Sequence, residues 1–83
     1  MMKTKIIEIY SKNCLSCDYI YRLQNRIGIY DDIIHYEFGS KEAKQFDVKS
    51  VPTFFIIINE EIVKKIENPE RKDIEKIKMI YCN

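Results

Sequence analysis

The chain lacks several features that would place it in a specialised class of protein. Its 83 residues contain no tryptophan, two glycines, two prolines and three cysteines. So few glycines and prolines exclude a collagen-like or low-complexity chain. An odd number of cysteines disfavours a scaffold held entirely by structural disulfides. The length suits one domain, residues 1–83, near the lower limit at which a single core is stable unaided.

Neither sign of charge dominates the chain. Lysine and arginine number 14 against 13 acidic residues, and the two kinds are interspersed along the sequence. No basic stripe is present, so we expect no nucleic-acid partner. The apolar runs fall well short of the roughly 18 residues of a membrane span, and no signal-peptide pattern is visible. We therefore expect a cytosolic monomer without a membrane partner, in a compartment where permanent disulfides are unusual.

The remaining composition is that of a globular protein, with 46% hydrophobic residues and abundant isoleucine. Apolar periodicity and turn residues predict strands at 5–10, 33–38, 53–58 and 61–66, and helices at 15–27, 41–46 and from 68–69 onward. The order β-α-β-α-β-β-α predicts an α/β fold with a mixed four-stranded sheet flanked by helices. The first two strands should be parallel, and the last two should form an antiparallel hairpin.

Two cysteines, Cys14 and Cys17, form a C-x-x-C motif at the start of the first predicted helix. Such a motif serves metal sites, structural disulfides and redox couples alike. At about 100° per residue, Cys17 lies on the edge of the apolar stripe formed by Ile20, Leu23 and Ile27. Cys14 lies about 60° further round, toward solvent, at the helix end that favours a thiolate. This asymmetry favours a nucleophile and a resolving thiol over two equivalent ligands.

An opening strand, a C-x-x-C at a helix start and the sequence SVPT at 50–53 together resemble the thioredoxin and glutaredoxin superfamily. The small glutaredoxin-like and thioredoxin-like redoxins look most similar, and the resemblance covers nearly the whole chain. It implies a thioredoxin-like fold with a redox-active Cys14–Cys17 disulfide and no bound cofactor. It also implies a cis bond between Val51 and Pro52 that faces the cysteines, with the Val51 backbone pairing with an extended substrate.

The chain also departs from the pattern of that superfamily. Asn13 stands where thioredoxins usually have tryptophan, and residues 15–16 are Leu-Ser where thioredoxins have Gly-Pro. The segment 66–73 lacks the glycine pair with which glutaredoxins hold glutathione. We therefore expect recycling by a thioredoxin-reductase-type enzyme, with Leu15 and Val51 forming an apolar rim around the disulfide.

Glu8, His35 and Cys82 lie outside these motifs and carry side chains that can ionise. Glu8 lies six residues before Cys14, where the resemblance implies a buried acid that handles the proton of the resolving thiol. Buried near Cys17, it would have a raised pKa and could act as a general base. The alternative, which the sequence favours, is that Glu8 points to solvent from a partly exposed strand. We expect His35 to be structural or exposed, and Cys82 to be a free thiol.

The leading hypothesis is a thiol–disulfide oxidoreductase that reduces protein disulfides. Its candidate residues are catalytic Cys14, Cys17 and Glu8, and substrate-binding Leu15, Val51 and Pro52. The alternative is a metal or iron–sulfur module, in which two C-x-x-C pairs of a dimer share the metal because one chain offers few further ligands. A redox-inactive interaction domain is a third hypothesis, which the retained cysteine pair disfavours.

Overall fold

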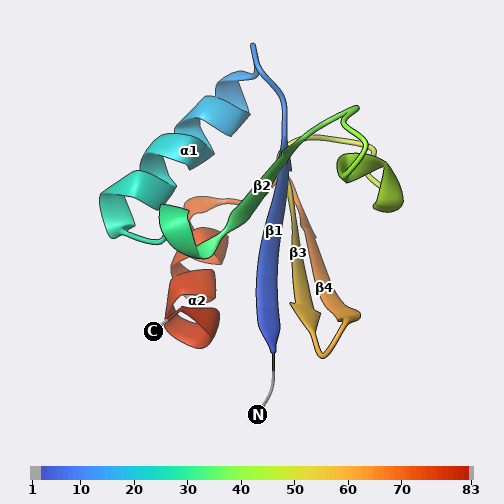
Figure 1. Ribbon diagram of the computed structural model, residues 1–83. Coiled ribbons are helices and arrows are strands. Elements are labelled where there is room, and N and C mark those ends of the chain that lie inside the picture. Colours follow the sequence, from blue (N-terminus) through green and yellow to red (C-terminus); the bar gives the residue numbers. More distant parts are fainter. Residues whose placement is uncertain (1–2, 83) are drawn as a thin grey trace.

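The computed structural model describes residues 3–82, which form a four-stranded sheet with both α-helices on one side (Figure 1). The elements are β1 (Thr4–Tyr10), α1 (Leu15–Ile27), η1 (Tyr30–Asp32), β2 (Ile34–Glu37), η2 (Ala43–Gln45), β3 (Thr53–Ile58), β4 (Glu61–Glu67) and α2 (Arg71–Tyr81). The strand order is β2-β1-β3-β4. β1 and β2 are parallel, and the other neighbouring strands are antiparallel. The predicted mixed α/β sheet is confirmed. No helix within 3–82 is long and apolar enough to cross a membrane.

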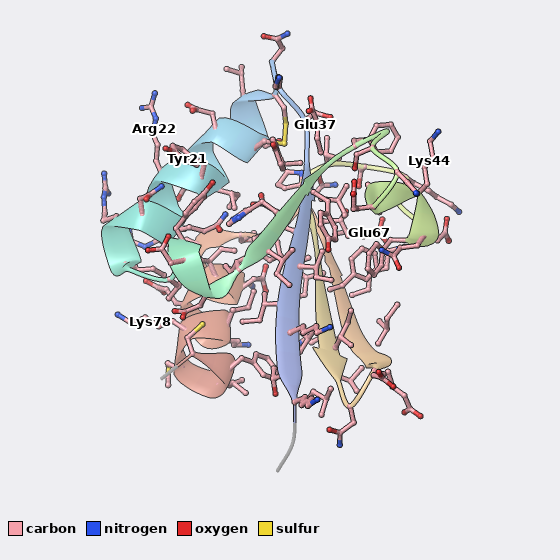
Figure 2. All side chains as sticks on the ribbon, viewed as in Figure 1. Tyr21, Arg22, Glu37, Lys44, Glu67 and Lys78 are labelled. Carbon is pink, nitrogen blue, oxygen red and sulfur yellow. A yellow bond between two sulfur atoms is a disulfide. The ribbon has the colours of Figure 1, made fainter. Side chains whose placement is uncertain are left out.

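The central strand β1 contributes to a core on each face of the sheet. Ile6 packs in the larger core with side chains of α1 and α2, whereas Ile7 and Ile9 pack in a second core on the opposite face. Figure 2 shows side chains filling the space between the helices and the sheet. Because side chains alternate along a strand, Glu8 lies on the same face as Ile6, beneath the helices.

Helix α1 begins and ends where the sequence predicts. Cys14 is the N-cap residue, and Gly28 ends the helix in the left-handed conformation with φ 81°. The Gly28 N–H donates to the carbonyl oxygens of Gln24 and Asn25, which satisfies groups that a helix end otherwise leaves free. The predicted apolar stripe, which includes Cys17, is the buried face of the helix.

The helix predicted over 41–46 is instead the single 3₁₀ turn η2. The Ser40 hydroxyl accepts a hydrogen bond from the Ala43 N–H at 3.1 Å, but the N-cap residue of η2 is Glu42 and not the predicted Ser40. The chain nevertheless returns to an extended conformation at Phe46. Phe46 and Val48 pack against the second core, with the Phe46 ring 4.8 Å from that of Phe55. Burial of these side chains outweighs continuation of a short helix.

The start of α2 also differs from the prediction, because Asn68 does not cap it. Asn68 has φ 47°, and its N–H donates to the Pro52 carbonyl at 3.1 Å, which ties the end of β4 to the residue before β3. The helix begins at Arg71, with Glu70 and Asp73 forming a capping box. The Glu70 N–H donates to Asp73 Oδ2 at 2.8 Å.

We expect Ile74→Ala to lower the free energy of unfolding by about 2–5 kcal/mol, because truncating a fully buried side chain leaves a cavity. Ile80 lies on the same helix but is 64% exposed. The matched control Ile80→Ala should therefore change the free energy by less than about 0.5 kcal/mol. Urea unfolding followed by circular dichroism measures both, and equal losses would contradict the assigned buried face of α2.

Candidate functional site

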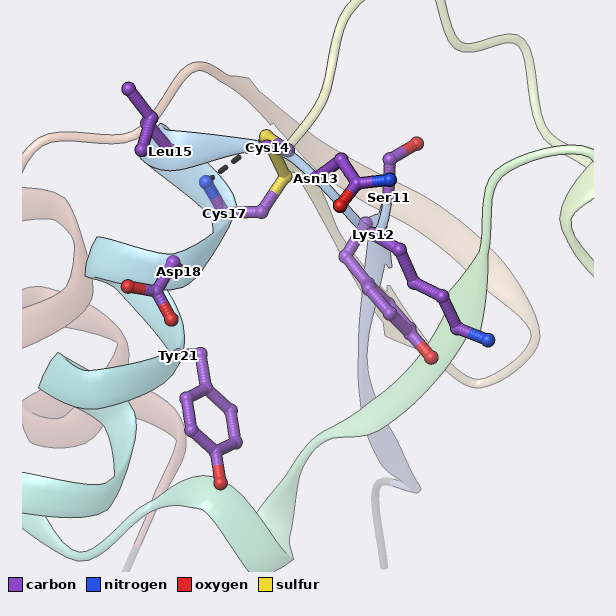
Figure 3. Close-up of a pocket in the computed structure, with 9 residues that line it drawn as sticks. Ser11, Lys12, Asn13, Cys14, Leu15, Cys17, Asp18 and Tyr21 are labelled. Atoms are coloured by element: carbon purple, nitrogen blue, oxygen red, sulfur yellow. Dashed lines mark hydrogen bonds between the residues drawn. A yellow bond between two sulfur atoms is a disulfide. The ribbon is translucent and has the colours of Figure 1, made fainter.

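The two cysteines of the motif are joined by a disulfide at the N-terminal end of α1 (Figures 2 and 3). Their Cα atoms are 5.2 Å apart. Cys14 is partly exposed, whereas Cys17 is only 4% exposed. The predicted asymmetry between the two thiols is therefore present, with Cys17 buried more deeply than the helix geometry alone suggested.

The surroundings of Cys14 favour a thiolate once the disulfide is reduced. Its sulfur accepts a hydrogen bond from the Cys17 backbone N–H at 3.1 Å (Figure 3), and the Ser16 hydroxyl lies 3.4 Å away. The N-terminal end of a helix also carries a positive partial charge. These donors favour negative charge on the sulfur of Cys14 over that of Cys17, whose side chain is buried.

Two surface pockets adjoin the cysteine motif. The first, of about 510 Å³, is lined by residues 10–15, 17, 18 and 21 (Figure 3). Leu15 contributes a side chain that is 91% exposed, directly beside Cys14. The second, of about 230 Å³, is lined by Ser11, Phe38, Lys49, Ser50 and Val51. Because Ser11 lines both pockets, the Val51 segment lies next to the cysteine loop.

The segment before β3 has the predicted backbone conformation, since the peptide bond between Val51 and Pro52 is cis. Pro52 is buried, and Val51 is partly buried against the second core. The Thr53 hydroxyl donates to the Ser50 carbonyl at 2.6 Å. Together with the hydrogen bond from Asn68 to Pro52, this contact holds the segment at both ends.

Glu8 is buried, which corrects the expectation that it points to solvent. It is 2% exposed, because strand alternation places it beneath α1. Gln24 Nε2 donates to Glu8 Oε1 at 3.0 Å. The other carboxyl oxygen, Oε2, is buried without a hydrogen-bond partner among residues 3–82. Burial raises the pKa of Glu8 to about 7, and the hydrogen bond from Gln24 acts in the opposite direction.

Gln24 and His35 complete a polar cluster around Glu8 that the sequence interpretation missed. His35 lies beside Glu8 in the register of β1 and β2. Its Nε2 is 2.8 Å from Gln24 Oε1 and 3.4 Å from Glu8 Oε1, and its ring stacks on Tyr30. A signal was available, because Gln24 lies seven residues after Cys17 on the apolar stripe, where a buried amide requires partners.

A small cavity lies between Cys17 and two members of the polar cluster, Glu8 and His35. It has a volume of about 150 Å³ and is lined by Glu8, Tyr10, Cys17, Tyr21, Tyr30 and His35. Cys17 and Glu8 therefore line the same cavity. In residues 3–82, no three His, Cys, Asp or Glu side chains are grouped so that they could hold a metal ion.

Solved structures of thioredoxins resemble the chain. The oxidised thioredoxin of Plasmodium falciparum has a TM-score of 0.77 at 16% identity, covering 96% of this chain and 82% of that one. The reduced thioredoxin pre-protein of Schistosoma mansoni has a TM-score of 0.70 at 22% identity, covering 90% and 75%. Thioredoxin f2 of Chlamydomonas reinhardtii has a TM-score of 0.68 at 21% identity, covering 96% and 81%. The chain therefore has the thioredoxin fold. No protein-family model and no curated protein matches the sequence.

The buried carboxyl group predicts a pH-dependent stability. The pKa of Glu8 rises from 4.5 to about 7 on folding, so the folded protein binds this proton more tightly than the unfolded chain. The stabilisation is complete below pH 4.5 and is lost as the pH rises through 7. At about 1.36 kcal/mol per pH unit, the loss is roughly 3 kcal/mol.

In the variant Glu8→Gln, the side chain at position 8 is neutral at every pH. Its free energy of unfolding should therefore not show this decrease as the pH rises. We expect the free energy of unfolding of the variant to gain roughly 3 kcal/mol relative to wild type between pH 4.5 and 7.5. The lowered pKa of His35 acts with the opposite sign in both proteins, so the difference between the two profiles reports Glu8 together with its interaction with His35. Urea titrations of the disulfide form measure this, with the exposed Glu61→Gln as control. Parallel profiles for Glu8→Gln and wild type would contradict the raised pKa.

Proposed function

We propose that the protein is a thiol–disulfide oxidoreductase that reduces disulfides of other proteins in the cytosol through the Cys14–Cys17 pair. One observation carries the proposal: the disulfide runs from a partly exposed helix N-cap to a buried sulfur that shares a cavity with Glu8. The fold adds support, because the solved structures that it resembles are thioredoxins.

In the first step, the Cys14 thiolate attacks one sulfur of a substrate disulfide. A Cys14–substrate bond forms, the substrate disulfide breaks, and the other substrate sulfur leaves as a thiolate. The hydrogen bond from the Cys17 N–H and the helix end favour Cys14 as the attacking group. Its partial exposure beside the 510 Å³ pocket supports access for a protein substrate.

In the second step, Cys17 attacks the Cys14 sulfur and releases the reduced substrate. The Cys17 thiol must first lose a proton, and thiols in apolar surroundings ionise poorly. Glu8 and His35 both face the same cavity, and Glu8, with a pKa of about 7, suits proton exchange near neutral pH. Glu8 therefore serves as the general base for Cys17.

Substrate contacts are assigned to Leu15, Val51 and Pro52. Leu15 offers an exposed apolar side chain next to Cys14. Val51 precedes β3 and borders the second pocket, so its backbone groups suit pairing with an extended substrate segment. The buried Pro52 holds Val51 in that position.

A reductase is the recycling partner that we propose. A solved structure with this fold is thioredoxin f2 in complex with ferredoxin:thioredoxin reductase, with a TM-score of 0.67 at 20% identity over 89% of this chain and 73% of that one. The exposed Leu15 and the partly exposed Val51 support docking of such an enzyme beside the disulfide.

Substitution of each of the two cysteines should cause a different defect in disulfide reduction. We expect Cys14→Ser to abolish insulin reduction, because the attacking thiolate is lost. Cys17→Ser should accumulate mixed disulfides on Cys14, because nothing resolves them. Cys82→Ser is the control and should retain full activity, because burial raises the pKa of Cys82 and keeps it a thiol. Mass spectrometry of trapped complexes checks the assignment, which substrates bound to Cys17 would overturn.

The recycling partner can be tested by direct competition between reductants. We expect a flavin thioredoxin reductase to reduce the Cys14–Cys17 disulfide faster than millimolar glutathione does. Glutathione needs groups that hold its carboxylates, whereas the segment 66–73 lacks the glycine pair and presents Glu67 and Glu70. Stopped-flow measurements of disulfide loss compare the two.

Leu15→Glu should slow the reductase selectively, because it places a charge on the apolar rim. Met79→Glu, at another exposed position that lies on α2, is the matched control and should leave the rate unchanged. Faster turnover with glutathione would show that the recycling partner is wrongly assigned.

A further inference from the structure

The hydrogen bonds among Glu8, Gln24 and His35 fix which of these groups donate and which accept. Glu8 Oε1 accepts from Gln24 Nε2, which leaves Gln24 Oε1 as an acceptor 2.8 Å from His35 Nε2. The His35 ring must therefore carry a hydrogen on Nε2, either as that neutral tautomer or as the imidazolium. The Gln24 N–H donates to Glu8 directly and favours negative charge there, since a carboxylate can only accept. The His35 N–H favours it indirectly, because it bonds to Gln24 Oε1 and holds the amide in that orientation.

The position of His35 is fixed independently of this chain of hydrogen bonds. Its side chain is 14% exposed, and its ring stacks on Tyr30 with the ring centres 4.1 Å apart. Its Nε2 is also 3.4 Å from Glu8 Oε1, close enough for a direct electrostatic interaction. His35 therefore acts on the same carboxyl oxygen directly and through Gln24.

The groups that face Glu8 and His35 include few other charges. The titratable side chains around them are Cys17 and Tyr21 from α1, Tyr10 from β1, and Tyr30 and Asp31 from η1. Burial lowers the pKa of His35 and the nearby Asp31 opposes this, whereas burial raises the pKa of Glu8. Both groups are thus held toward their neutral forms, and the 3.4 Å between His35 Nε2 and Glu8 Oε1 is close enough for the charge of one to affect the other.

We propose that Glu8, Gln24 and His35 form one proton-accepting unit, in which His35 is a positioning residue that sets the pH at which Glu8 takes the proton of Cys17. This inference rests on the proposed function and extends it. The unpartnered Glu8 Oε2 is the site that receives the proton, because Oε1 already accepts the hydrogen bond from Gln24.

The resolving step moves one proton to Glu8 and completes the transfer of two electrons to the substrate. The Cys17 proton moves to Glu8, and the Cys17 sulfur forms a bond with the Cys14 sulfur. The bond from Cys14 to the substrate breaks, and the substrate sulfur leaves with the electron pair. The substrate disulfide has gained two electrons, which the two cysteines have supplied. Glu8 finally releases its proton to solvent or to the leaving thiolate.

The first experiment titrates Glu8 in the disulfide form by carboxyl ¹³C NMR, which requires no redox activity. Wild type should titrate near pH 7. His35→Phe keeps a flat ring against Tyr30 but loses the N–H, so the midpoint should rise. His35→Lys replaces a ring that burial holds toward its neutral form by an amine with a much higher usual pKa, so the midpoint should fall by about one pH unit or more.

Glu37→Gln is the matched control, because it removes a charge from the same strand, β2. Its midpoint should equal that of wild type. Far-UV circular dichroism and urea unfolding verify that each variant folds, and His35→Phe keeps the test valid if His35→Lys does not fold. If Glu8 has the same titration midpoint in wild type and in the folded His35 variants, then His35 does not set the pH at which Glu8 binds a proton, and the proposal is wrong.

The second experiment follows release of a thionitrobenzoate group from a mixed disulfide made on Cys14 of the reduced protein. The pH at half-maximal rate should move in the same direction as the Glu8 midpoint in each variant. NMR midpoints that shift while the release profile stays fixed would overturn the link to Cys17. If the wild-type mixed disulfide is not resolved at any pH, the proposed function is wrong. Shifted NMR midpoints would in that case still support the coupling of His35 to Glu8.

Discussion

The packing of α1 across β1 is the contact on which the arrangement of the site depends. The apolar stripe of the helix is buried against the sheet, and this docking fixes the depth of every side chain on that stripe. Cys17 and Gln24 lie on the stripe, whereas Cys14 stays at the partly exposed helix end. The buried face of one helix thus supplies a buried sulfur and a buried amide, and the N-terminal end of the same helix supplies an accessible sulfur. The asymmetry that disulfide exchange requires is a consequence of ordinary helix packing.

Elements governed by local patterns were predictable from the sequence. The bounds of α1 follow from its periodicity and from Gly28, whose φ of 81° suits a residue without a side chain. The strand TFFIII (Thr53–Ile58) and the turn at Asn59 and Glu60 were equally clear, since both turn residues adopt positive φ as a tight hairpin requires. The cysteine geometry followed from 3.6 residues per turn. These features need only a window of neighbouring residues.

Features that depend on distant partners were not predictable in this way. The 3₁₀ turn η2 is short because the Phe46 side chain packs against Phe55 on the sheet. Asn68 does not cap α2 because its N–H pairs with the carbonyl of Pro52, sixteen residues earlier. The burial of Glu8 depends on Gln24 from the helix and on the parallel register with β2. In each case the tertiary contact outweighs the local preference.

The polar cluster is difficult to explain as a device for stability. A carboxyl group that is 2% exposed, with one oxygen lacking any hydrogen bond within residues 3–82, loses stabilisation as it ionises toward neutral pH. An apolar side chain of similar volume at position 8 would pack beneath α1 without that loss, as replacements of buried ionic groups in other proteins demonstrate. Gln24 and His35 reduce the penalty without removing it, since they bond to one carboxyl oxygen and leave the other free. A site that retains an unsatisfied acid beside a buried sulfur conflicts with the requirements of a core but meets those of proton transfer.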